Sequence, residues 1–519
     1  MNTNADSSPA AHAASGHDRR WLGLFAVLAA MIMNLLDSTV ANVAGPAIRA
    51  DLGGTTADLQ WVATAYTLAM AVGLLTGGRL GDMFGRRRML LWGVTGFLVT
   101  SAACALAWSP GSLIVARAAQ GLCAALMLPQ SFGLIKALFP PQQVGKAFGA
   151  LGPVIGLATI LGPLVAGTLV DADVWGTGWR MVFLINLPLG AFALAAGVRS
   201  LPRGGRQDGL RLDGVGALLG GAGMFLLVFP LVQGRELGWP AWLWTMTAGA
   251  VAAFVLFGVR QTRRLRAGRA PLVELGVLRL RSYSSGLGFT VVFFGAIVGF
   301  SLTLGLFLQL GRGYGPMDAS IVMAPWAIGA FFGSAFGGAL MGRLGRHILH
   351  IGLAVMAVGQ VLAHLVIGSA GTGVDGSDLV VPLLIYGFGM GQIFVPLFDI
   401  VLGDVRNHEL GSASGLLESF QQTGSSLGVA VLGTVFFSGV TGSTDGPASV
   451  GDFVSAERQV VLLALGMTVL AFALAFLLPR RARQATPAAD DSPTAPTAEA
   501  PAPTGEPTGT PEAVGAEAR

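Results

Sequence analysis

The stretch Gly73–Arg88, GLLTGGRLGDMFGRRR, decides how the rest of the chain is interpreted. It passes from an apolar segment into a dense cluster of arginines, with one acid, Asp82, between them. Glycine recurs at every fourth position from Gly73 to Gly85, so on a helix it forms a smooth stripe that a second helix can approach closely. Asp82 and Arg86 are four residues apart and can pair on one face. The stretch therefore predicts either a packing stripe with a positively charged anchor or a moving gate.

The composition predicts an all-α integral membrane protein. Of 519 residues, 53% are hydrophobic and only 12% are charged. Apolar runs of about 18 residues or more recur along the chain, as expected of membrane-spanning helices. Fourteen spans are predicted, at residues 21–43, 59–80, 89–107, 113–135, 147–170, 181–198, 213–232, 242–259, 286–308, 320–341, 348–368, 379–402, 412–437 and 460–478.

The distribution of Lys and Arg tests this count independently. If the N-terminus is cytoplasmic, the even-numbered connections should carry the positive charge. They do, by roughly five to one under the positive-inside rule. The exceptions are Arg49, Arg180, Arg235, Arg312 and Arg458. A missed helix would invert the pattern downstream, so both termini are predicted to be cytoplasmic.

An internal repeat divides the chain. The sequence from Gly338 to His347 resembles the sequence from Gly78 to Arg87, and the two copies end the second and tenth predicted helices. Duplicated helix bundles are common in secondary transporters. The predicted plan is six plus two plus six helices: a disordered cytoplasmic start (1–20), an N-terminal bundle (21–199), an inserted helix pair with basic loops (200–282), a C-terminal bundle (283–478) and a disordered tail rich in Pro, Ala and Thr (479–519).

Several classes of chemistry find no support in the residues. Cys104 and Cys123 lie in apolar segments and predict neither disulfide nor metal site, and the histidines stand apart from carboxylates and cysteines. Lys146 follows a glycine but precedes Ala147, so the chain has no phosphate-binding loop of the Gly-Lys-Ser/Thr type. No metal, no cofactor and no enzymatic activity are predicted, and nucleic acid is a poor partner for arginines placed at helix ends.

Ionisable groups inside membrane spans are costly and usually functional. Asp37 lies about sixteen residues into the first span, or roughly 24 Å from its inner end. Arg117 enters the fourth span from outside, so the two can pair in the outer half of the membrane. The alternative is a permanent salt bridge that fixes the first helix on the fourth.

Further candidates are weaker. Glu418 lies two turns into the thirteenth span, beside Gln421, and is either a second coupling carboxyl or an interfacial group. Gly and Pro crowd the fifth span, which predicts a bent helix at the bundle interface or simple tight packing. Those residues are Gly156, Gly162, Pro163 and Gly167; candidates for lining a cavity are Asn34, Trp61, Tyr66, Gln120 and Gln421.

With these motifs in order, the chain resembles the major facilitator superfamily, in particular its fourteen-helix drug:proton antiporters. The resemblance covers nearly everything between Trp21 and Leu478. It rests on Gly78–Arg88, Leu36–Pro46, Arg117–Gly121, Gly156–Gly167, Gln60–Tyr66 and Trp179–Pro188.

The resemblance implies alternating access between two six-helix bundles, driven by the proton gradient. Asp37 would then bind a proton or a cationic substrate, Arg117 would tune it, and Asp82 and Arg86 would latch the cytoplasmic side together with Gly78 and Gly85. Glu418 lies in a stretch that is commonly uncharged in the related proteins.

The function expected is proton-coupled export of hydrophobic or cationic drugs or antibiotics by a monomer in the cell membrane. Export of one self-made metabolite, uptake, and a non-transport sensor are the alternatives, in that order.

Overall fold

The computed structural model describes residues 9–54, 56–140, 176–204, 212–234, 237–269, 271–273, 276–406, 409–441 and 449–479, together with isolated positions between 141 and 175. Within these residues the fold is helical, with no strand. Thirteen helical stretches are long and apolar enough to cross a membrane. They overlap thirteen of the fourteen predicted spans, with most boundaries within a few residues; the last helix begins at Val450, ten residues before the predicted span 460–478. The remaining one, 147–170, lies largely outside the described residues.

The helices of the first half are α1 (Pro9–Leu52), α2 (Thr56–Phe84), α3 (Arg86–Ala105), α4 (Pro110–Leu138), α7 (Met181–Leu184), α8 (Asn186–Ser200), α9 (Gly214–Gln233) and α10 (Ala241–Arg266). Those of the second half are α11 (Arg281–Leu306), α12 (Pro316–Leu344), α13 (His347–Ala370), α14 (Val380–Gly403), α15 (Leu410–Thr441) and α16 (Val450–Ala475). α1 begins at Pro9, earlier than the predicted disordered start allows, because an Ala-rich segment of high helix propensity precedes the span. The tail beyond Pro479 lies outside the described residues.

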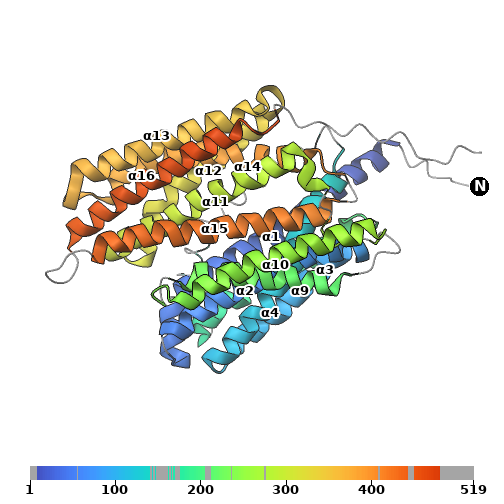
Figure 1. Cartoon of the computed structure of the whole chain (residues 1–519), viewed down its shortest axis with the longest axis horizontal. Coiled ribbons are helices and arrows are strands. Elements are labelled where there is room, and N and C mark those ends of the chain that lie inside the picture. Colours follow the sequence, from blue (N-terminus) through green and yellow to red (C-terminus); the bar gives the residue numbers. More distant parts are fainter. Residues whose placement is uncertain are drawn as a thin grey trace, which may run out of the picture. The chain divides into compact units, whose positions relative to one another are not determined.

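The helices pack in two groups (Figure 1). α11 to α16 pack mainly on one another, as do α1 to α4 with α8. α9 and α10 pack on each other, and α9 also contacts α2 and α15. α15 is the helix of the second group that lies most closely against the first, through α2, α4 and α9. The six-plus-two-plus-six division itself stays a prediction.

Glycines set the closest helix contacts, as the stripe in the opening stretch predicted. A Cβ added at Gly73 would lie 2.7 Å from the Cβ of Ala125 on α4, and one at Gly77 would lie 2.9 Å from the Ala125 carbonyl carbon. Gly78 points the other way, onto α15. α2 therefore packs on two helices through two adjacent glycine faces.

Each copy of the repeated motif contains a glycine of positive φ where one helix ends and the next begins, although the ψ values of the two glycines differ. Gly85 joins α2 to α3 at φ +92°, and Gly345 joins α12 to α13 at φ +51°. Positive φ is accessible to glycine at little cost and strained for residues with a Cβ. The backbone thus explains why glycine ends both copies.

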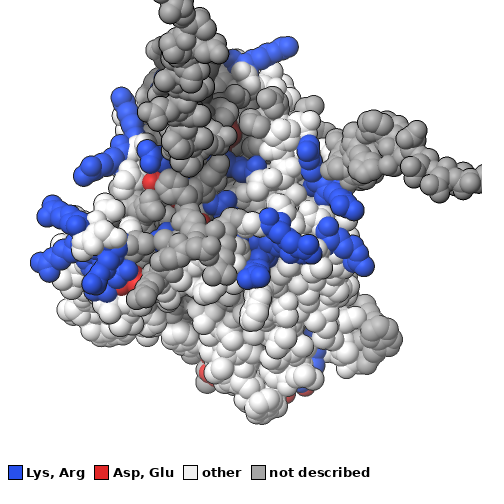
Figure 2. All heavy atoms as spheres, turned by 90° about the vertical axis from the view of Figure 1, so that its right-hand side faces the viewer, with Lys and Arg blue, Asp and Glu red and all other residues white. Residues whose placement is uncertain are grey.

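Arginine gathers at one end of the helices, seen end-on in Figure 2. We call this the basic end; its exposed members include Arg88, Arg203, Arg263, Arg266, Arg281, Arg343 and Arg406. The opposite end carries few cations, and one of them is held by a carboxylate: Arg180 donates to Asp51 (2.6 Å), which also accepts from the Trp179 indole (3.0 Å). These hydrogen bonds lower the pKa of Asp51.

Candidate functional site

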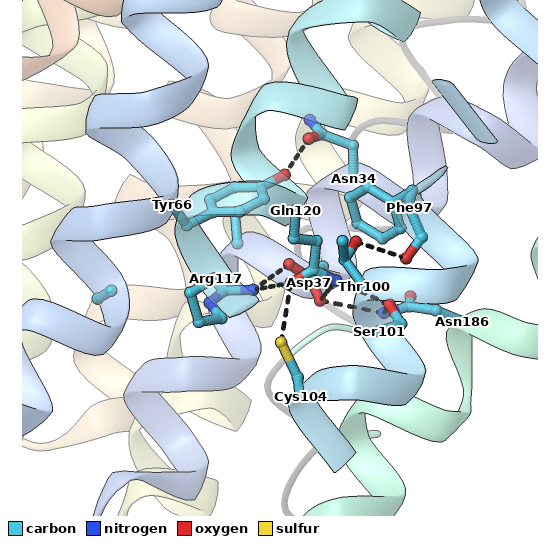
Figure 3. Close-up of polar contacts among 12 residues, drawn as sticks. Asn34, Asp37, Tyr66, Phe97, Thr100, Ser101, Cys104, Arg117, Gln120 and Asn186 are labelled. Carbon is cyan, nitrogen blue, oxygen red and sulfur yellow. Dashed lines mark hydrogen bonds and ion pairs between the residues drawn. The ribbon is translucent and has the colours of Figure 1, made fainter. Parts of the chain in front are cut away.

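A buried polar network centred on Asp37 lies inside the first group of helices (Figure 3). Asp37 comes from α1 and Arg117 from α4, and both are 0% exposed. Arg117 Nη1 donates to Asp37 Oδ2, which makes the ion pair that the sequence suggested. Its Nε donates to the carbonyl oxygen of Val62 on α2 (3.2 Å).

Two amides complete the shell of the carboxylate. Gln120 donates through Nε2 to Asp37 Oδ1 (3.0 Å), and Asn186 donates through Nδ2 to the same oxygen (3.0 Å). Both amides also donate to the Ser101 hydroxyl, at 2.7 and 3.1 Å. Gln120 Oε1 accepts from Arg117 (2.8 Å). Four helices, α1, α3, α4 and α8, thus supply one hydrogen-bonded cluster.

Aromatic rings cover the guanidinium. The ring centroid of Tyr66 lies 4.3 Å from Arg117 Cζ, and that of Phe183 lies 5.7 Å away. The Tyr66 hydroxyl in turn donates to Asn34 Oδ1. A cation stacked on aromatic faces and paired with a carboxylate is stabilised in a site that excludes water.

A break between two helices positions Asn186. α7 ends at Leu184 and α8 begins at Asn186, two residues before Pro188, which has no N–H to donate to the preceding turn. Asn186 and Ser101 belong to the network but were absent from the candidates that the sequence suggested. An amide in an otherwise apolar span was the available signal.

A second cluster lies at the basic end, around Asp82. Its side chain is 1% exposed, 3.6 Å from Arg86 Nη2 and 3.9 Å from Arg79 Nη1, and it accepts a hydrogen bond from the backbone N–H of Ser412 on α15. A Cβ added at Gly411 would lie 2.7 Å from the Asp82 carboxyl carbon. Asp82 therefore bridges the two groups of helices instead of pairing only within its own.

α4 and α14 meet at the same end through a different contact. Lys136 Nζ donates to the carbonyl oxygen of Leu402, in the last turn of α14 (2.7 Å). Phe132 stacks on Phe398 with ring centroids 4.7 Å apart. A cation at a helix C-terminus is favoured by the helix dipole. The basic end is thus held by two contacts between the groups, α2 with α15 and α4 with α14.

Glu418 lies on α15 beyond Gly411 and Gly415. At 100° per residue these three residues share the face that packs on α2. Glu418 is 7% exposed and makes no hydrogen bond or ion pair with a described residue. It therefore lies on the face of α15 that meets α2, whereas Gln421 turns off this face.

Only some of the remaining candidates from the sequence belong to the Asp37 network. Asn34, Tyr66 and Gln120 join the Asp37 network, but Trp61 packs on Phe229 of α9 (5.8 Å between centroids). Of the helix-five motif, Gly162 is described, as a buried helical residue, while Gly156, Pro163 and Gly167 lie outside the described residues. No group of three metal-ligating side chains occurs in the searched, described part of the chain.

Comparison with known proteins identifies the family. The model of the Major Facilitator Superfamily matches residues 27–429. The chain belongs to this superfamily of transporters.

Three of its relatives come from Streptomyces and are named for antibiotics. A probable actinorhodin transporter of Streptomyces coelicolor is 48% identical, covering 86% of this chain and 77% of that protein. A tetracenomycin C resistance and export protein of Streptomyces glaucescens is 34% identical (84% and 80% covered), and a puromycin resistance protein of Streptomyces alboniger is 35% identical (89% and 91% covered).

The fold is shared with a solved transporter. The crystal structure of the human organic anion transporter MFSD10 superposes with a TM-score of 0.60 at 16% identity, covering 88% of this chain and 98% of that one. The superfamily match, together with the thirteen apolar helices, makes the chain a multi-pass membrane transporter and not an enzyme.

Proposed function

We propose that this transporter exports hydrophobic or cationic antibiotics across the cytoplasmic membrane in exchange for protons. The observation that carries the proposal is the Asp37–Arg117 network, a buried charge pair inside the first group of helices. The names of the three relatives, each an antibiotic transporter, exporter or resistance protein, support the class of substrate.

Proton coupling needs a structural element that can adopt two states, and the Asp37 network can serve as that element. Protonation of Asp37 would remove the charge that compensates Arg117, and breaking a buried pair costs about 3–5 kcal/mol. Arg117 would then need a new partner, so the packing of α1 on α4 would change. Binding of substrate and of the proton would favour different arrangements of one cluster, which makes them compete.

The contacts at the basic end represent one of the two gates. The positive-inside rule assigns this end to the cytoplasm. Asp82 with α15, and Lys136 with α14, would hold the cytoplasmic side shut while protons load from outside. Their release would open the cavity to substrate on the inner side.

Drug-induced proton movement in everted membrane vesicles tests the proposal. Actinorhodin, tetracenomycin C, puromycin and an unrelated hydrophobic cation would each be added to energised vesicles that report their internal pH. Proton release with at least one compound, absent from vesicles without the protein, is expected. No release with any compound, or substrate movement in the direction of uptake, would contradict the proposal.

A narrow exporter of a single metabolite is the second candidate, because two relatives are named for one compound as its transporter or exporter. The same panel separates the two. A response to one compound alone indicates the narrow exporter, and responses to several unrelated compounds indicate a broad one.

A further inference from the structure

The second group of helices contains a buried carboxyl that the Asp37 network does not use. Glu457 lies in the second turn of α16 and is 0% exposed. Neither of its carboxyl oxygens has a hydrogen-bond partner among the described residues. The Thr303 hydroxyl of α11 lies close enough to interact with the carboxyl, and it also donates to the carbonyl oxygen of Phe300 (3.2 Å).

The arginines near Glu457 contact other residues. Arg458, the next residue, points to α13, where its Nη2 lies 3.4 Å from Nε2 of His364. Arg312, after the π-helical turn that packs on α16, donates to the carbonyl oxygen of Thr372 (2.6 Å). The acidic residue of α15, Glu418, lies toward the basic end. It is therefore far from Glu457, which lies near the opposite end on α16. Within the described residues, no positive charge compensates the Glu457 carboxyl.

An isolated ionised carboxylate is very costly to bury, and such a group is normally neutral instead. Glu457 is therefore in place to hold a proton on one of its oxygens. We propose that Glu457 is a proton-binding site in the second group of helices, separate from Asp37 and exchanging protons with the aqueous phase at the end opposite the basic end.

The position of Glu457 fits access from that end. It lies seven residues after Val450, the first residue of α16, so roughly 10 Å of helix separates it from the helix end. The His364–Arg458 contact aligns α13 with α16, and Gln360 lies one turn before His364 on α13, on the side of the basic end.

Further polar groups in these helices lack partners. The side-chain amide of Gln360 and the hydroxyl of Tyr386 are buried without a hydrogen bond among the described residues. Tyr386 packs on Phe300, one turn from Thr303 (5.2 Å between ring centroids). Glu457 thus belongs to a group of helices that contains several buried polar side chains without partners among the described residues.

In the transport cycle Glu457 would contribute a second proton to the exchange, a role that rests on the proposed proton-coupled export. The binding of a proton to Glu457 does not itself depend on the proposed export. Infrared spectroscopy therefore provides the first test, because a protonated carboxyl has a C=O stretching band distinct from that of a carboxylate. The full chain in lipid nanodiscs would be titrated from pH 5 to pH 9.

The wild type is expected to show a protonated-carboxyl band that is lost as the pH rises, and Glu457→Gln is expected to lack that band. Glu457→Asp, which keeps a carboxyl, should retain a titrating band at a shifted frequency, and this variant guards against misfolding of the first. Asp318→Asn, which removes an exposed acid at the same end, is the matched control and should leave the band unchanged.

Two results would overturn the inference: identical spectra for wild type and Glu457→Gln, or a Glu457 band that does not respond to pH. The second would mean a permanently protonated, purely structural carboxyl. In proteoliposomes, Glu457→Gln is expected to lower the number of protons exchanged per substrate by one. Unchanged stoichiometry would refute the coupling role alone, and failure of transport in the wild type would instead refute the proposed function.

Discussion

Substitution of Gly78 by Ala should open the basic end. The added Cβ would lie 3.1 Å from the carbonyl carbon of Gly411 and 3.4 Å from the Cα of Gly415, and closer still to the Gly411 carbonyl oxygen. All three are backbone atoms that cannot rotate aside. Because carbon atoms pack best at about 3.5–4.0 Å, α2 and α15 must separate locally by about 1 Å.

The cost of this separation follows from overpacking, which is typically about 1–3 kcal/mol. A conformational equilibrium shifted by that amount changes by roughly 5- to 150-fold. The closed basic end alone contains this contact, so the shift favours the arrangement in which α2 and α15 have parted. Loss of the Ser412 N–H bond to Asp82 would add to the effect.

The assay is thiol labelling from the basic end. Ser412 is 1% exposed, so a Ser412→Cys variant, with Cys104 and Cys123 replaced, should react slowly with a membrane-impermeant maleimide. Adding Gly78→Ala should raise the labelling rate at least fivefold. Gly342→Ala is the matched control, because a Cβ there meets nothing within 4 Å. Equal rates with and without Gly78→Ala in folded protein, or an equal rise with the control, would refute the reasoning.

Three further predictions concern single side chains. Asp82→Asn should slow transport while substrate affinity stays within about twofold, measured by equilibrium binding beside efflux; lost binding with normal gating would contradict its role as a gate. Lys136→Met removes the donor to Leu402, so labelling at the basic end should accelerate by up to roughly tenfold, and Lys136→Arg should restore the wild-type rate. The pKa of Asp51 is lowered by its hydrogen bonds to Trp179 and Arg180, so its stabilising effect is present above about pH 4 and lost as the pH falls below that. Asp51→Asn should therefore lower the thermal unfolding temperature by more at pH 7 than at pH 3; a difference that grew on acidification would show the sign to be wrong.

Much of the fold could be predicted because hydrophobic length and charge placement are properties of single segments. Thirteen predicted spans overlap observed helices, although the last begins ten residues late, and the family was identified from motifs in the right order. The pairing of Asp37 with Arg117 could also be predicted, since depth along each helix follows from residue number alone. Both predictions depend only on where a residue lies along its own helix.

What could not be predicted depends on which way a helix faces. Asn186 reaches Asp37 because the chain breaks just before it, and Trp61 turns to α9 instead of a cavity, neither of which a residue count reveals. Lys136 contacts the end of α14, which its position in the sequence does not reveal. The burial of Glu457 depends on where Arg458 and its other neighbours point, and that is decided by packing between distant segments.

We propose that the Asp37–Arg117 network couples export to protons, and proton flux in proteoliposomes is the sharpest test of this coupling. Wild type and Asp37→Asn would be reconstituted in equal amounts, and protons moved per substrate transported would be counted under an imposed pH gradient. We expect substrate-dependent proton movement in the wild type and none in Asp37→Asn, with Asp318→Asn behaving as the wild type. Full coupled exchange in folded Asp37→Asn would contradict the account.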